Sequence, residues 1–196
     1  MARWTPDAAR RLQEAAVALF SEEGFASVTV GSIAARAGLT ERTFFRYFAT
    51  KEDVLFSDGP AILEQIVDAL RSAPADSAPI DVLRHVSARL GSMFDHQRAY
   101  HRLRTGLISM EPALLERDLL KHEQWSAAVA EELAARGLSR ERATVLAVST
   151  TAAFRYVYVS WSTDRRRGPL VARFNEALEN LGNDLTQRAR ARGPAR

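Results

Sequence analysis

Two arginines and two phenylalanines near the N-terminus stand at spacings that place them on separate faces of one short helix. Within the stretch GLTERTFFRYFATKEDV (residues 38–54), Phe44 and Phe48 are four residues apart, and so are Arg42 and Arg46. Residues at this spacing share a helix face, so the rings can pack inward while the guanidinium groups point outward. Such a helix is suited to reading DNA, although arginines on a helix more often belong to a plain solvated face.

A reading helix needs neighbouring elements that hold it in place. A helix-turn-helix consists of a first short helix, a tight turn that usually contains glycine, and a second helix that enters the major groove. Thr29 can cap the first helix, and Gly38 stands where the chain must turn sharply. Thr40 can cap the second helix, which we expect to end near Phe48. Residues 29–48 therefore predict a helix-turn-helix.

Helix signals dominate the remaining sequence, and strand signals are nearly absent, so the predicted fold is all-α. Thr5 and Pro6 predict the start of a first helix, and Gly24 predicts its end. A further helix should begin near Lys51, with a bend or break at Gly59-Pro60. The loop-like segment 72–79 precedes helical patterns at roughly 80–95, 97–109, 112–136, 140–163 and 169–190.

Composition and charge support DNA binding only weakly. The formal net charge is +3 and the pI is about 9.7, but residues 1–58 hold seven Lys/Arg against eight Asp/Glu. There are no cysteines, which excludes disulfides and thiolate metal sites, and the N-terminus carries no signal-peptide pattern. The apolar run 145–161 contains Arg155 near its centre, so a buried bundle helix is expected there, with no membrane partner and a cytoplasmic location.

Residues 8–56 resemble the N-terminal domain of the tetracycline-repressor (TetR) family of bacterial transcriptional regulators. The resemblance is carried, in order, by LF…GF…T at the end of the first helix, IAARAG, the reading helix T-x-F-x-x-Y-F and the KEDVL that follows it. It implies a DNA-binding domain at residues 1–58 and a helical effector-binding and dimerisation domain at residues 59–196. The implied function is a repressor that binds a palindromic operator as a homodimer and is released by a small-molecule effector.

The resemblance also implies which residues meet the DNA operator. Arg42, Thr43 and Arg46 would face the groove, with the two arginines reading bases because arginine can grip guanine O6 and N7. Tyr47 and Lys51 would hold phosphates. The complete set of expected DNA contacts is Thr29, Ser32, Thr40, Arg42, Thr43, Phe45, Arg46, Tyr47 and Lys51.

Two positions depart from the family pattern. Phe45 stands where the family very often has tyrosine, so a hydroxyl–phosphate bond is lost and ring contact remains. Gly31 stands where many members carry a longer side chain, so the first helix of the motif should read little sequence, and Ser32 would contact the DNA backbone instead.

The last two predicted helices are expected to form the homodimer interface. Residues 145–161 are apolar on more than one side, as expected of a helix that faces its own core and a partner. The final helix carries an apolar stripe whose members are the interface candidates Leu170, Phe174, Leu178, Leu181 and Leu185. The alternative is that these side chains pack only within their own chain.

The middle helices are expected to enclose a small-molecule effector. Arg104 and Arg155 stand among apolar residues, where an arginine needs an acidic partner or an anionic ligand. The stretch EPALLERDLLKHEQWSAAVAEELAAR is similar to regulators that bind acyl-CoA-like ligands, which favours an elongated acyl or aromatic compound. The pocket candidates are Met93, Phe94, His101, Arg104, Leu107, Met110, Trp125, Phe154, Arg155 and Tyr158.

An enzyme is the first alternative, and the sequence offers little for it. It contains no HExxH motif, no nucleophile elbow and no glycine-rich phosphate loop, so no catalytic residue and no cofactor are expected. A metal site built from His96, His101 and Glu111 is conceivable, but hydrogen-bonded or solvated histidines are the better interpretation. A second alternative is a DNA-binding protein whose body binds no ligand.

Overall fold

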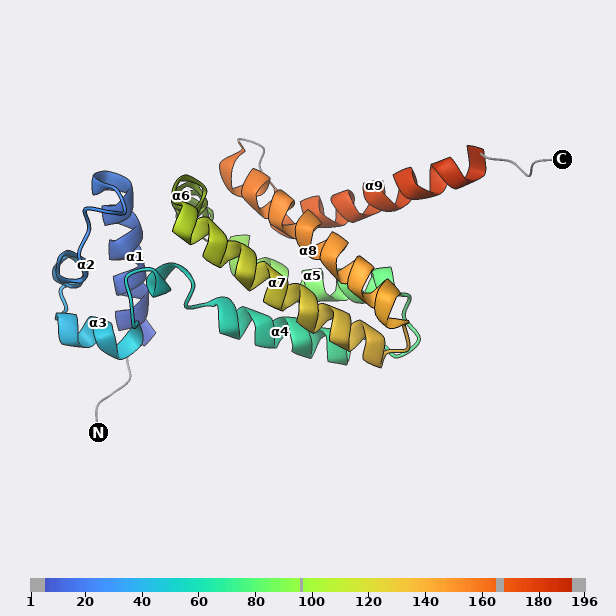
Figure 1. Ribbon diagram of the computed structural model, residues 1–196, viewed down its shortest axis with the longest axis horizontal. Coiled ribbons are helices and arrows are strands. Elements are labelled where there is room, and N and C mark those ends of the chain that lie inside the picture. Colours follow the sequence, from blue (N-terminus) through green and yellow to red (C-terminus); the bar gives the residue numbers. More distant parts are fainter. Residues whose placement is uncertain (1–5, 96, 165–167, 192–196) are drawn as a thin grey trace. The chain divides into compact units, whose positions relative to one another are not determined.

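The computed structural model describes residues 6–95, 97–164 and 168–191, and every regular element within these ranges is a helix (Figure 1). The all-α prediction is confirmed. Thr5, the predicted cap of the first helix, lies outside the described residues. The elements are α1 (Pro6–Glu23), α2 (Val30–Arg36), α3 (Glu41–Tyr47), the 3-10 turn η1 (Asp53–Leu55), α4 (Gly59–Ser72), α5 (Pro79–Asp95), α6 (Arg98–Met110), α7 (Pro112–Ala135), α8 (Arg140–Thr163) and α9 (Leu170–Ala191).

Glycines of positive φ follow the first two helices and turn the chain toward the next helix. Gly24 ends α1 with a φ of 82°, a left-handed conformation that glycine adopts without steric cost. Phe25 then folds back onto the last turn, with its ring centroid 4.9 Å from that of Phe20. Gly38, with a φ of 65°, makes the turn between α2 and α3. Contacts join α1 to α2, α1 to α3 and α2 to α3 (Figure 1), so the predicted helix-turn-helix is formed.

The Gly59-Pro60 pair breaks the helix that was predicted to begin near Lys51. The first part is the short turn η1, and α4 begins at Gly59. Pro60 therefore lies in the first turn of α4, where its missing N–H would have had no intrahelical acceptor.

The chain forms two compact units, and each unit combines two segments that are not consecutive in sequence. The first contains residues 1–62 together with 97–121, and the second contains residues 63–96 and 122–196. Thus α6 and the start of α7 belong to the unit of the helix-turn-helix. The predicted domain boundary between residues 58 and 59 stays a prediction.

One shared core explains why α6 and the start of α7 join the first unit. Leu12 and Phe20 of α1 and Phe44 of α3 are fully buried or nearly so, in the same apolar cluster as Leu107 of α6 and Leu114 of α7. Contacts join α1 to α6 directly. The hydrophobic effect thereby holds two segments that are far apart in sequence in one body.

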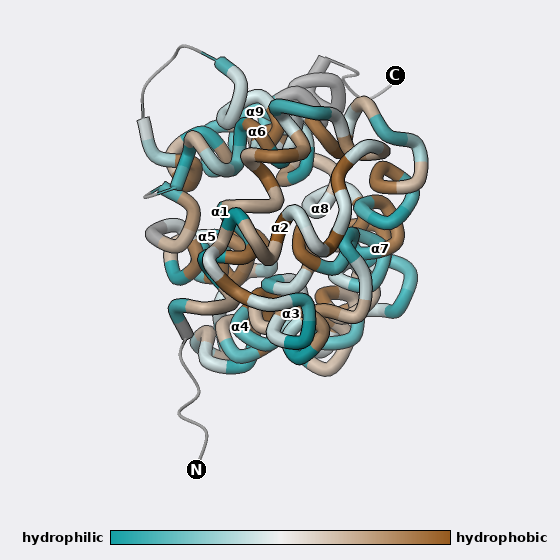
Figure 2. The backbone as a smooth tube through the Cα atoms, turned by 90° about the vertical axis from the view of Figure 1, so that its left-hand side faces the viewer, coloured by the Kyte–Doolittle hydropathy of each residue, from teal (hydrophilic) through white to brown (hydrophobic). Residues whose placement is uncertain are grey.

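The second unit is built mainly on the packing of α5, α8 and α9. Contacts join α9 to α5 and to α8. The side chain of Trp161 is 1% exposed, and its indole N–H donates to the carbonyl oxygen of Gly168 over 3.0 Å. Along many of the helices the backbone alternates between hydrophobic and hydrophilic stretches (Figure 2), as expected of amphipathic helices with a buried face.

Candidate nucleic-acid interface

The helix α3 separates its aromatic side chains from its charged ones as predicted. Phe44 is fully buried and Phe48 is 4% exposed, whereas Arg42 and Arg46 are both exposed. The ring of Phe45 is 55% exposed, although it packs edge-on against Phe44 with centroids 5.6 Å apart. The buried rings fix the helix to the core, so the outward face holds a defined orientation.

Threonines cap both helices of the motif, which confirms two predicted local roles. The Thr29 hydroxyl accepts from the backbone N–H of Ser32 over 3.1 Å, and the Ser32 hydroxyl oxygen accepts from the N–H of Thr29 over 3.1 Å. The Thr40 hydroxyl accepts from the N–H of Thr43 over 3.2 Å and lies 3.0 Å from the Thr43 hydroxyl. The backbone bonds are reciprocal at α2, and at the start of both helices they satisfy N–H groups that the helix itself leaves unpaired. The expected DNA contacts of these four residues stay predictions.

Arg46 and Tyr47 contact each other, although the sequence suggested separate roles for them. An Nη2 hydrogen of Arg46 is donated to the Tyr47 hydroxyl over 3.2 Å, and the guanidinium carbon lies 4.9 Å from the ring centroid. The contact holds the Arg46 guanidinium group against the Tyr47 side chain on α3.

Lys51 has a structural role that the sequence did not reveal. Its ammonium group donates to the carbonyl oxygens of Phe25 over 2.8 Å and Val28 over 3.0 Å, and it lies 4.4 Å from the Phe25 ring centroid. These bonds close the loop between α1 and α2 onto the segment that follows α3. The predicted phosphate contact of Lys51 stays a prediction beside this role.

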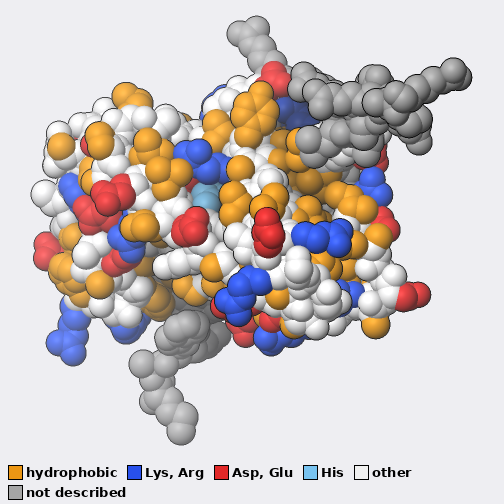
Figure 3. Space-filling model, turned by 45° about the vertical axis from the view of Figure 1, so that its right-hand side comes forward, with side chains coloured by type: hydrophobic (Ala, Val, Ile, Leu, Met, Phe, Trp, Pro, Cys, Tyr) orange, Lys and Arg blue, Asp and Glu red, His pale blue; other side chains and the backbone are white. Residues whose placement is uncertain are grey.

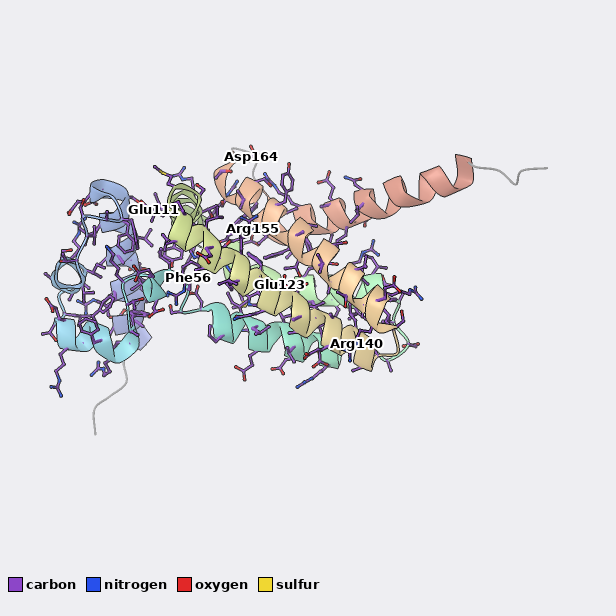
Figure 4. The ribbon with its side chains drawn as sticks, viewed as in Figure 1. Phe56, Glu111, Glu123, Arg140, Arg155 and Asp164 are labelled. Atoms are coloured by element: carbon purple, nitrogen blue, oxygen red, sulfur yellow. The ribbon has the colours of Figure 1, made fainter. Side chains whose placement is uncertain are left out.

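A cluster of charges around Phe56 ties α6 and the start of α7 to η1. Phe56, labelled in Figure 4, follows η1, and cationic groups of Arg104, Arg117 and Lys121 lie 5.2, 5.0 and 5.9 Å from its ring centroid. The Nε–H of Arg104 donates to the carbonyl oxygen of Leu55 over 2.7 Å. These cations stabilise the ring electrostatically as well as by packing.

Carboxylates complete this cluster. Asp118 lies 2.6 Å from the Lys121 ammonium and 3.7 Å from an Arg104 nitrogen, and all three side chains are nearly buried. Arg117 pairs with Asp53 of η1. The sequence predicts an acidic partner or an anionic ligand for Arg104. In the structure, Arg104 contacts the carboxylate of Asp118 and the backbone carbonyl of Leu55.

Burial and neighbouring charges shift three pKa values here. Burial, with a smaller contribution from Arg104, lowers the pKa of His101 to about 4, while Asp58 acts to raise it. Burial and Arg104 lower the pKa of Lys121 to about 8, against the opposing effects of Asp118 and Asp58. For the carboxyl of Asp53, burial acts to raise the pKa, but hydrogen bonds from Arg117 and Thr50 outweigh it, and the net shift is downward.

Several of the residues expected to bind an effector gather in the second unit. Phe94 of α5 lies 6.0 Å from Phe154 and 5.8 Å from Tyr158 of α8, measured between ring centroids. Phe154 and Tyr158 stack at 6.1 Å between ring centroids. Arg155, which is labelled in Figure 4, follows Phe154 on α8. Trp125 is buried against His122 of α7, with centroids 5.2 Å apart.

The other pocket candidates are placed differently. His101, Arg104 and Leu107 are buried in the first unit, on the face of α6 that packs with the helix-turn-helix. Met93 is 40% exposed and Met110 is 80% exposed, so the expectation that Met110 lines an enclosed pocket is not supported by its position at the end of α6.

The predicted dimer stripe on α9 requires a correction. Leu170, Phe174 and Leu178 are buried within the chain, and the Phe174 ring lies 5.5 Å from that of Phe154. They form core between α9 and its intrachain neighbours and offer no surface to a partner. Leu181 is 40% exposed, whereas the side chain of Leu185 lies outside the described residues.

Exposed apolar side chains instead follow α8. Val145, Val148, Ala152, Tyr156 and Val159 recur at intervals of three and four residues, and all five are exposed, Tyr156 to 75%. Hydrophobic side chains open to solvent are visible on the face drawn in Figure 3. The signal in the sequence was the apolar character of residues 145–161 on more than one side, but the sequence could not tell which side the chain itself buries.

Metal sites and membrane-spanning helices are both absent from the part of the chain that the structure describes. No group of three or more His, Asp or Glu residues there is placed to hold a metal ion, and His96, a candidate ligand, falls outside it. None of the helices searched is both long and apolar enough to span a bilayer.

Comparisons with known proteins match both halves of the chain. A family described as "Bacterial regulatory proteins, tetR family" matches residues 12–57, and one described as "MftR C-terminal domain" matches residues 77–186. A relative described as a candidate mycofactocin biosynthesis transcriptional regulator, MftR of Mycobacterium tuberculosis, is 28% identical over 64% of this chain and 63% of its own. The transcriptional regulator TcmR of Streptomyces glaucescens is 33% identical over 62% of this chain and 56% of its own. The matches thus span about three fifths of the length of these relatives.

Solved structures share the fold at low sequence identity. FadR of Thermus thermophilus, a repressor solved with lauroyl-CoA, has a TM-score of 0.58 and 22% identity, covering 89% of this chain and 93% of that one. FadR of Bacillus subtilis, solved with stearoyl-CoA, has a TM-score of 0.59 and 20% identity, covering 88% of this chain and 96% of that one.

Proposed function

Because the chain belongs to the TetR family of bacterial regulators, we propose that it is a repressor that binds an operator in double-stranded DNA and is released by a small-molecule effector. The observation that carries this proposal is α3, whose buried Phe44 and Phe48 hold Arg42 and Arg46 outward within the matched region. Two exposed arginines one helical turn apart suit adjacent guanines in a major groove.

Binding to duplexes selected in vitro tests the DNA-reading part of the proposal. Arg46→Ala should weaken binding to the selected duplex by about fivefold to 150-fold while leaving binding to random DNA within about twofold, because a base contact discriminates by about 1–3 kcal/mol. Lys51→Ala should weaken binding to all sequences alike. Because Lys51 also bonds to the loop after α1, the melting temperature of the Lys51→Ala protein must be measured in parallel. Unchanged specific binding by Arg46→Ala at matched salt would exclude Arg46 as a base reader.

The proposed operator is palindromic and the proposed regulator is a homodimer. A helix of two turns makes few base contacts, so two copies placed about 34–36 Å apart would supply the missing specificity. The exposed stripe Val145, Val148, Ala152, Tyr156 and Val159 on α8 supports such pairing, because its spacing of three and four residues suits packing against a partner helix. Leu181 of α9 is also exposed.

The proposed effector is a fatty acyl compound, with acyl-CoA thioesters as the first choice. The FadR proteins of similar fold were solved with lauroyl-CoA and stearoyl-CoA. In this chain, Phe94 of α5 and the rings of Phe154 and Tyr158 of α8 supply apolar surface for an acyl chain. Arg155, also on α8, supplies a cation for an anionic group.

Thermal stability measured against a panel of compounds tests the effector. A ligand that binds the native state raises the melting temperature, so lauroyl-CoA or stearoyl-CoA should raise it more than coenzyme A alone. The same compounds should release the selected duplex. A panel in which no acyl compound shifts the melting temperature or the DNA affinity would favour a DNA-binding protein with a body that binds no ligand.

Release requires that an effector favour a form of the dimer whose reading helices no longer match the operator. We place the moving element at α4, which follows η1, so that the separation of the two copies of α3 changes. The bonds from Arg104 to Leu55 and from Arg117 to Asp53 support the last step, because they make η1, α6 and the start of α7 one body with the reading helix, and α4 begins at Gly59, shortly after η1. A displacement of that body would therefore displace α3 as well.

A further inference from the structure

An acidic side chain stands at the start of the reading helix, where the proposed ligand is a polyanion. Glu41 is the first residue of α3 and is exposed, on the same side of the helix as Phe45. Each phosphate of a duplex repels a carboxylate, so this residue opposes the general attraction that arginines provide. A residue that costs affinity for every sequence can still improve the discrimination between sequences.

The missing side chain of Gly31 gives the Glu41 carboxylate its place. A Cβ atom added to Gly31 would lie only 2.6 Å from Oε1 of Glu41 and 3.7 Å from the hydroxyl oxygen of Thr29. The carboxylate thus occupies the space above Gly31, beside the cap of α2. Because Thr29 is one of the expected DNA contacts, a phosphate bound there and the carboxylate in this position would repel each other. DNA binding therefore favours a rotation of the Glu41 side chain toward the groove.

Few other charges on the motif compensate for this acid. Arg36 of α2 is engaged with Glu22, with a closest nitrogen–oxygen distance of 2.8 Å. Arg42 and Arg46 are the exposed cations on α3 itself. A carboxylate turned into the groove between phosphate backbones consequently needs a hydrogen-bond donor from a base.

We propose that Glu41 is a specificity-determining residue that accepts a hydrogen bond from the N4 amino group of a cytosine in the major groove. This inference rests on the proposed DNA-binding function. The amino donors in that groove belong to cytosine and adenine, and adenine presents its N7 acceptor beside the amino group, which repels a second carboxylate oxygen. On the outer side of N4 cytosine presents a C–H group in place of an acceptor, so the carboxylate discriminates in its favour. Together with arginines that read guanine, Glu41 predicts an operator rich in G·C pairs near the start of α3.

In vitro selection from a random duplex library tests the proposal directly, using the full chain. The wild type should enrich a motif with cytosine at one position of each half-site, and replacement of that base pair should weaken binding about tenfold. Glu41→Gln should change the preference at that same position from cytosine to adenine, because an amide can donate to N7 and accept from the adenine amino group. Both proteins should melt at similar temperatures, since the side chain is exposed.

Two further variants separate contact from charge. Glu41→Asp keeps the charge but shortens the side chain, so it should lose the cytosine preference without gaining affinity for random DNA. Glu23→Gln removes the same charge from an exposed position at the end of α1 and should leave the selected motif unchanged. If Glu41→Gln selects the wild-type motif and merely binds all duplexes more tightly, Glu41 is only repulsive and the proposal is wrong. If the wild type enriches no motif at all, the proposed function itself fails.

Discussion

The two compact units differ in the charges that they bury: Arg104 and Asp118, which are both buried, belong to the first. In the first, cations lie against rings and backbone carbonyls, as Arg104 does at Phe56 and Leu55 and as Lys51 does at Phe25. In the second, aromatic contacts such as those of Phe94 with residues of α8 lie in the interior, and the half-buried Arg136 also donates to the backbone carbonyls of Leu70 and Ala73. Charged networks require defined geometry, whereas apolar contacts tolerate rearrangement. The ion pair of Arg104 and Asp118 therefore gives the first unit a buried charge network of defined geometry.

The strongest test of this contrast removes a buried cation from the first unit. Arg104→Met should lower the free energy of unfolding by about 3–5 kcal/mol, because it leaves the carbonyl of Leu55 without its donor and weakens the pairing of Asp118. Urea denaturation followed by circular dichroism measures the change. The matched control is Arg71→Met in the second unit, whose ion pair with Glu132 is largely open to solvent on the arginine side. An equal loss in both variants would remove the proposed difference between the units.

The next largest effect is expected from the exposed stripe of α8. Val148→Glu combined with Tyr156→Glu places like charges on the proposed dimer surface and should produce a monomer. Loss of the second half-site contact should weaken operator binding by about a hundredfold or more. Sedimentation and duplex binding report the two effects. The control, Glu116→Lys on α7, changes charge elsewhere and should leave the dimer intact; a dimeric double variant would place the interface on another surface.

The low pKa of His101 predicts acid sensitivity of the first unit. Its pKa is about 4 in the folded chain against 6.5 for the ordinary side chain, so below pH 6.5 the unfolded chain binds the extra proton first. Stability is complete above pH 6.5 and falls as the pH drops toward 4, by about 2 kcal/mol at pH 5 from this group. His101→Gln should flatten this part of the profile of unfolding free energy against pH. An unchanged slope would contradict the burial of a neutral imidazole.

The smallest expected effect on the free energy of unfolding comes from Lys121, and it arises at alkaline pH, whereas that of His101 arises at acidic pH. Its pKa is about 8 in the folded chain and 10.5 ordinarily, so the folded chain loses this proton first and gains stability as the pH rises above 8. The gain should reach about 1–2 kcal/mol at pH 9. The difference between wild type and Lys121→Met isolates this contribution from other titrating groups. A difference that is independent of pH would show that Lys121 is more solvated than its surroundings indicate.

Local chemistry made much of the fold predictable. Thr29, Gly38 and Thr40 act through neighbours two or three residues away, so sequence alone located α2, the turn and α3. The four-residue spacing of Phe44 and Phe48 predicted that both rings lie on the buried face of α3, and both are buried.

What the sequence could not settle depended on distant partners. Lys51 bonds to carbonyls more than twenty residues away, and Arg104 reaches Leu55 across almost fifty. The apolar stripe of α9 carries no sign that tells intrachain core from partner surface, so Leu170, Phe174 and Leu178 were misassigned. Gly31 indicated the loss of a groove-reading side chain, but the use of its space by Glu41 follows only from the folded geometry.

Fluorescence anisotropy of a labelled duplex from the in vitro selection is the most direct test of the central claim, that α3 reads DNA. The wild type should bind this duplex at least a hundredfold more tightly than a scrambled one at moderate salt, and Arg42→Ala with Arg46→Ala should reduce that ratio to nearly one. Equal, weak binding of the wild type to both duplexes would contradict the claim.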